Sequence, residues 1–249
     1  MMGLQRKLLS SLLDLQWIGS LVVFALIAIW LQIPDSHVWQ FVISILTGAV
    51  IVIAFCWLQV VIFAKVNRGT TRGWLWARMA GFAIVAAIWF LSERWISSGS
   101  NHLWLHAAYW NSRLSPGQRV IFTPARLVSW STALITLLEW IMFGILLPLA
   151  IEASTTGPLR ISIRRVRLPW SKALYWLAVI VACLVGMQLT GVLISWMPGK
   201  GISGQIASVA ARLLFVYTAD VLLWCILLML AGSWMDNPSS VTKEAEAVR

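Results

Sequence analysis

Residues 42–61 have the sequence VISILTGAVIVIAFCWLQVV, twenty positions without a charged side chain. A helix of that length rises about 30 Å, which matches the hydrocarbon core of a bilayer. Five more stretches share this length and composition. We therefore predict six membrane spans, at about residues 17–33, 39–64, 74–92, 128–151, 171–196 and 207–234.

The composition agrees with a chain that has lipid as its main solvent. Of its 249 residues, 60% are apolar and 11% are charged, and the mean hydropathy is +0.83. A soluble domain carries about 25% charged residues. In lipid every backbone polar group needs an internal partner, and the long runs without alternation favour helices over a barrel. We predict an all-α membrane protein, with residues 1–249 as one domain of three helical hairpins and a tail at 235–249.

Two shorter segments have the amphipathic pattern of helices that lie on a membrane surface. The first is residues 4–15, before the first span. The second is residues 159–172, where apolar residues alternate with basic ones. Anionic headgroups of the cytoplasmic leaflet are the expected partner of this second segment, and a partner protein in a membrane complex is the alternative. Its basic residues are Arg160, Arg164, Arg165, Arg167 and Lys172.

The distribution of Lys and Arg predicts the orientation in the membrane. The N-terminus, the connections at 65–78 and 152–172 and the C-terminal tail lie on one side and carry 13 of the 19 basic residues; the other side carries 6. Both termini are therefore expected in the cytoplasm. The net charge of +10 has no soluble basic module to carry it, which argues against a nucleic-acid partner.

Three arginines, Arg78, Arg126 and Arg212, lie within about one turn of the start of predicted spans, and we expect their side chains to snorkel to the interface. Within the fourth span, Pro148 should bend the helix. Ala77 and Gly81, four residues apart, would let neighbouring helices approach closely.

Two acids, Glu139 and Asp220, lie about a dozen residues inside their spans and so near the middle of the bilayer. A carboxylate there costs at least about 2.5 kcal/mol, so both should face the interior of the bundle. They are our candidates for a proton or ion path. The alternative is a pair of neutral carboxyl groups that hydrogen-bond to neighbouring helices and only fix the packing.

Metal and cofactor sites are not expected. His102 and His106 are spaced to share one face of a helix, which suits a metal, but a zinc site needs a third ligand. Solvated histidines at the interface are the favoured interpretation. No histidine lies inside a predicted span, which argues against a bis-histidine haem. The cysteines Cys56, Cys183 and Cys225 are expected to be buried free thiols.

The second half of the chain resembles a known group of membrane domains. The segment Gly157-Pro158-Leu159-Arg160-Ile161-Ser162-Ile163-Arg164-Arg165, followed by Trp170 and a long apolar hairpin, is similar to bacterial six-span domains related to the membrane region of glycerophosphoryl diester phosphodiesterases. The separate catalytic domain of that family has no counterpart in this sequence. The resemblance thus implies a membrane module without phosphodiesterase activity, in a bacterial inner membrane.

These observations favour a non-enzymatic membrane module, which would act as a scaffold, an accessory subunit or a permease-like partner. The sequence contains little mass outside the predicted spans and no motif for nucleophilic or metal-assisted catalysis. A small proton- or ion-coupled transporter that uses Glu139 and Asp220 is the alternative. Hydration of these two acids would distinguish the two functions.

Overall fold

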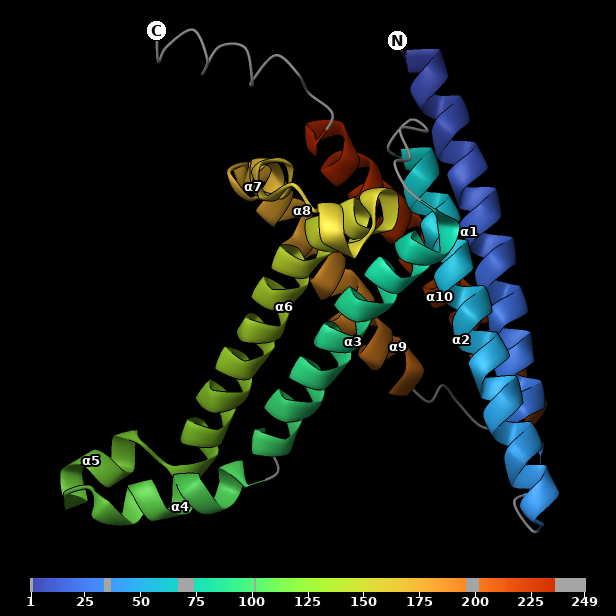
Figure 1. Ribbon diagram of the computed structural model, residues 1–249. Helices are drawn as coiled ribbons and strands as arrows, with labels where there is room; N and C mark the ends of the chain where they lie inside the picture. The colour runs from blue at the N-terminus through green and yellow to red at the C-terminus, as the bar shows by residue number, and fades with distance from the viewer. Residues whose placement is uncertain (1, 34–36, 67–73, 101, 196–201, 236–249) are drawn as a thin grey trace, which may run out of the picture.

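The computed structural model describes residues 2–33, 37–66, 74–100, 102–195 and 202–235, and in these ranges every regular element is a helix (Figure 1). The predicted tail beyond Met235 lies outside the described residues. In chain order the elements are α1 (Met2–Trp30), α2 (Val38–Val66), α3 (Leu75–Ser100), α4 (Leu103–Arg113), α5 (Pro116–Ile121), α6 (Pro124–Thr156), η1 (Pro158–Arg160), α7 (Ile163–Trp170), α8 (Ala173–Cys183), the π-helical η2 (Leu184–Leu189), α9 (Thr190–Ser195) and α10 (Ile202–Met235).

Six segments are long and apolar enough to cross a membrane, which confirms the predicted class: this is a multi-pass membrane protein. The spans pair as predicted, α1 with α2, α3 with α6, and the run α8–η2–α9 with α10. Their bounds are Leu9–Trp30, Val38–Val66, Leu75–Gly99, Pro124–Thr156, Ala173–Leu193 and Gln205–Met235.

The first two helix pairs form the arms of a V (Figure 1). They meet near the start of α1, α7 and the end of α10, which we call the proximal end of the bundle. They diverge toward α4 and α5, which we call the distal end. The last span, α10, contacts α1, α2 and α6, so it bridges the two arms.

The predicted amphipathic helix at residues 4–15 is not a separate element, and that prediction is wrong. Helix α1 runs without a break from Met2 to Trp30. No Gly or Pro lies between residues 4 and 17 to end a helix, and the face that carries Leu12 is buried against the bundle. A hydrogen bond of 3.0 Å from Lys65 Nζ to Ser11 Oγ joins this extension to the end of α2.

The second amphipathic segment is shorter than predicted. It divides into η1 and the eight-residue α7, and Pro169 lies inside α7. The span before it, α6, begins at Pro124 and not near residue 128, because Thr123 caps it and proline suits its first position. As predicted, α6 contains Pro148, and its last turns run at an angle to the rest of the helix (Figure 1).

Helices α3 and α6 approach most closely at the proximal end. A Cβ atom on Gly81 would lie 2.6 Å from the carbonyl oxygen of Ala153, so only glycine allows this contact. One turn earlier in α3, Ala77 lies against Gly157, whose φ of +85° ends α6 in a conformation that L side chains rarely adopt. The small-residue pair predicted from the sequence, Ala77 and Gly81, is therefore the contact surface of α3.

The contact at Gly81 gives the first testable prediction. Gly81→Ala should lower the free energy of unfolding by about 1–3 kcal/mol, because the added methyl group meets backbone that cannot move aside. Gly99→Ala is the matched control, since nothing lies within 4 Å of a Cβ atom at that end of the same helix. Thermal unfolding in detergent measures both. Equal stability of the two variants would contradict the close packing of α3 on α6.

Candidate functional site

A cavity of about 520 Å³ lies between the arms of the V, with walls from α1, α2, α3, α6 and α10. Eight of its eighteen lining residues are aromatic. Ring contacts with centroids 5.5–6.3 Å apart join six of the lining side chains in a continuous chain, in the order Phe55, Phe82, Phe63, Trp224, Phe143 and Trp89. A cavity of this size and character suits a small, largely apolar ligand.

Five polar side chains interrupt the aromatic lining, from α1, α2 and α10: Gln16, Ser20, Gln59, Tyr217 and Asp220. The Ser20 and Tyr217 hydroxyl oxygens lie 2.9 Å apart, and each oxygen is also within hydrogen-bond distance of a backbone carbonyl of α1, so their two hydrogens serve two of these three contacts. Gln59 Nε2 donates to Gln16 Oε1 over 3.5 Å. These bonds fix the polar part of the wall where α1 meets α2 and α10.

Two acceptor atoms in this wall have no hydrogen-bond partner among the described residues. They are Gln59 Oε1, on a side chain that is 2% exposed, and Asp220 Oδ1. A buried polar atom without a partner costs about 1–3 kcal/mol. Such atoms in the wall of a cavity indicate a place where a ligand can supply the missing donor.

Asp220 also borders a second cavity, of about 190 Å³, together with Gly186 and Cys183. A Cβ atom on Gly186 would lie 3.4 Å from Asp220 Oδ1, so the helix backbone passes close to the carboxyl group. Gly186 belongs to the π-helical η2, and the hydroxyl of Thr190, just after η2, interacts with the same carboxyl group. π-Helical turns within longer helices occur frequently at functional sites.

Glu139, the other acid predicted in the membrane, borders neither of these two cavities. Phe143, one helical turn after it, contacts Trp224, one turn after Asp220. Because α6 and α10 both run from the distal to the proximal end, the two acids lie at the same level of the bundle (Figure 1). Glu139 instead lies near enough to Glu93 of α3 for the two like charges to repel each other. Only Asp220 of the predicted pair thus belongs to the cavities.

The prediction that Arg78 snorkels outward is wrong. Arg78 is 9% exposed, and its guanidinium donates hydrogen bonds to the carbonyl oxygens of Ser154, at 2.7 Å, and Val60, at 3.3 Å. Ser154 lies in the last turn of α6, where carbonyl groups lack partners within the helix and a cation is favoured. Arg78 therefore binds α3 to α6 and α2 at the proximal end.

The other two arginines bind nearby backbone carbonyls. Arg126 donates to Ile121 over 3.1 Å. Arg212 donates to Ser208 and to Leu193, over 3.1 and 2.8 Å, and so ties α10 to the end of α9.

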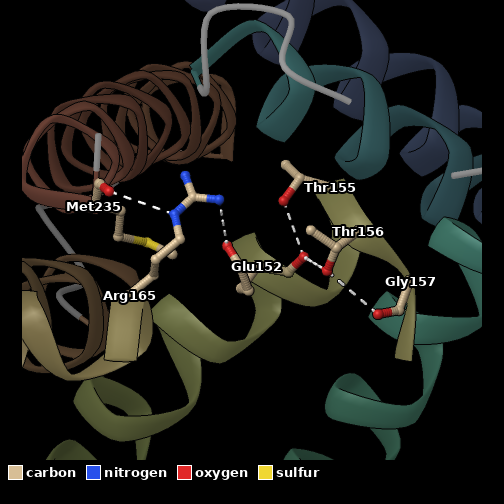
Figure 2. A network of polar contacts seen from close by, with 6 residues as sticks. All are labelled: Glu152, Thr155, Thr156, Gly157, Arg165 and Met235. Carbon is tan, nitrogen blue, oxygen red and sulfur yellow. Dashed lines mark hydrogen bonds and ion pairs between the residues drawn. The ribbon is translucent and has the colours of Figure 1, made fainter. Parts of the chain in front are cut away.

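A partly buried ion pair that the sequence analysis missed joins helices at the proximal end (Figure 2). Glu152, 1% exposed, lies 3.2 Å from Arg165 Nη1 of α7, and Arg165 Nε donates over 3.5 Å to the carbonyl of Met235 at the end of α10. The hydroxyls of Thr155 and Thr156 both bond to the backbone carbonyl of Glu152. One arginine thus connects three helices.

This pair divides the predicted basic segment in two. Arg165 points into the protein, whereas the remaining members are exposed at the proximal end: Arg160, Arg164, Arg167 and Lys172. Glu152 could have been noticed as a lone acid at the end of an apolar run that an arginine-rich segment follows.

The predicted histidine pair shows no metal site. His102 precedes α4 and His106 lies on it, both exposed, and no group of three potential metal ligands occurs among the described residues. The three cysteines are buried and free, as predicted.

Compared with known proteins, the chain matches no family model, no curated protein and no solved structure. The resemblance of its second half to six-span domains therefore stays a prediction.

A double-mutant cycle tests the ion pair. Glu152→Gln and Arg165→Met should each lower the free energy of unfolding. The effect of the double variant should differ from the sum of the two single effects by about 0.5–3 kcal/mol, as for residues in direct contact. Arg167→Met is the matched control, since Arg167 is exposed on the same helix and its effect should add to that of Glu152→Gln. Unfolding in mixed micelles measures the free energies. Additivity of the Arg165 and Glu152 variants would contradict the pair.

Proposed function

We propose that this protein is a non-enzymatic, permease-like membrane module that binds a small amphipathic molecule in the cavity between its helix pairs. The observation that carries the proposal is the cavity itself, with an aromatic wall and one polar cluster. The polar groups suit binding: the hydroxyls of Ser20 and Tyr217 contact each other and backbone carbonyls of α1, and none of these partners is a general base that would activate a nucleophile.

A proton- or ion-coupled transporter is the second candidate. It is favoured by the place of Asp220 between two cavities and against a π-helical segment, and by the second acid, Glu139, at the same level of the bundle. In such a protein Asp220 would exchange its proton or ion with the bound molecule. The binding cavity is common to both candidates, so its occupation is the first property to test.

The bacterial inner membrane, with both termini in the cytoplasm, is the location that we propose. It is supported by the excess of basic residues on the side of the termini. The exposed basic residues around α7 lie at that same proximal end. Contact with anionic headgroups of the cytoplasmic leaflet is their proposed role, at about 1 kcal/mol for each basic residue.

Filling the cavity should abolish binding. Ala86 lines the cavity, whereas its neighbour Ala87 is exposed on the outside of α3. We expect wild type and Ala87→Phe to bind N-phenyl-1-naphthylamine saturably, and Ala86→Phe to lose this binding. Energy transfer from tryptophan is a suitable measurement, because Trp89 and Trp224 lie in the wall. Identical binding by both variants would refute the proposed cavity function.

Cysteine labelling tests the orientation. In a background that lacks the three native cysteines, Gln118→Cys on α5 and Ser171→Cys after α7 place single exposed thiols at opposite ends of the bundle. In intact bacterial cells a membrane-impermeant maleimide should label the Gln118 variant and not the Ser171 variant, which should react after lysis. The reverse pattern would contradict cytoplasmic termini.

A further inference from the structure

We infer that the ligand of this cavity is a lipophilic cation, with its ammonium group bound at Asp220 and its apolar part among the aromatic rings. The inference rests on the proposed binding function and adds the chemical class of the ligand. It combines the charge of the wall, its unpaired atoms and the nature of its rings.

The ionisable groups in the lining of the two cavities are of one sign only. Among the described residues that line the two cavities there is one acid, Asp220, and no Lys, Arg or His. An anionic ligand would meet a carboxyl group without a compensating cation. A cationic ligand would provide the counter-charge that a carboxylate needs in the hydrocarbon layer.

The unpaired atoms of the wall are acceptors that lack a hydrogen-bond donor. Gln59 Oε1 and Asp220 Oδ1 are both acceptors without a partner among the described residues. An ammonium group carries donors and no acceptor, so it complements these atoms, whereas an ether or ketone would not.

The aromatic rings favour the same class of ligand. Trp89, Phe143 and Trp224 border both cavities together with Asp220. The faces of such rings attract cations, most strongly when water is excluded, and they also accommodate an apolar body.

Charges beyond the wall support an orientation for the ligand. On the distal side Glu93 lies one turn from Trp89, and Glu139 lies one turn from Phe143. The two acids are close enough for their like charges to repel each other. Arg94 lies next to Glu93 at that end but is exposed. On the proximal side the buried Arg78 lies one turn from Phe82 and binds backbone carbonyls. Because acids lie on the distal side and a buried arginine on the proximal side, a cationic group of the ligand is favoured near Asp220 and disfavoured near Arg78.

A matched set of ligands tests the inference on the purified full-length protein. 4-Phenylbutylamine, 4-phenylbutanol and 4-phenylbutyrate share one apolar body and differ in the charge of the end group. We expect the amine to bind about ten- to a hundredfold more tightly than the alcohol, the range of a hydrogen bond to a charged group, and the carboxylate most weakly. Calorimetry in detergent measures the three dissociation constants.

Variants assign the preference to Asp220. Asp220→Asn should reduce the affinity for the amine to that for the alcohol and leave the alcohol unchanged, which also shows that the cavity is intact. Asp220→Glu should keep the preference for the amine. Asp14→Asn is the matched control, since it removes an exposed carboxylate of α1 outside the cavity lining and should change nothing.

The outcomes separate the two claims. Equal binding of amine and alcohol by wild type, or an amine preference that survives Asp220→Asn, would overturn the cationic ligand and leave the binding cavity in place. Tightest binding of the carboxylate would also overturn it. Failure of all three compounds to bind would count against the ligand class and, together with unchanged dye binding in Ala86→Phe, against the cavity function itself.

Discussion

The close approach of α3 to α6 at the proximal end is the constraint on which the site depends. Gly81 lets the two backbones touch, and Arg78 donates a hydrogen bond to the carbonyl of Ser154 at the end of α6. Toward the distal end the α3–α6 pair leans away from α1 and α2 (Figure 1). The cavity lies between the diverging arms, and its lining includes eight aromatic side chains.

The proximal end is also where charges are paired. Glu152 and Arg165 connect α6, α7 and the end of α10, and Arg78 connects α3 to α2 and α6. Removing charge from water is costly unless each group finds a partner, and here each of these groups has one. Asp220 differs, because one of its oxygens is buried without a partner. The bundle thus separates charges that hold it together from an acid that borders the two cavities.

The features of the structure that depend on local composition could be predicted from the sequence. Length and hydropathy predicted the six spans, and the cost of burying a carboxylate selected Glu139 and Asp220, of which only Asp220 lines the cavities. Sequence could not predict the cavity, because Gln59 and Phe143 meet there through the crossing of helices that are far apart in the chain. The prediction for Arg78 is wrong for a similar reason: its partners Ser154 and Val60 come from two other helices, α6 and α2, and the snorkelling rule considers only the helix that carries the arginine.

The reaction of Asp220 with an apolar carbodiimide tests the central claim most directly. Dicyclohexylcarbodiimide enters the hydrocarbon layer and modifies carboxyl groups that it can reach there. For the protein in bilayer vesicles, the account predicts modification at Asp220, detected by peptide mass spectrometry. A folded protein in which Asp220 stays unmodified would show that helices seal this carboxyl group, and would contradict an open cavity within the membrane.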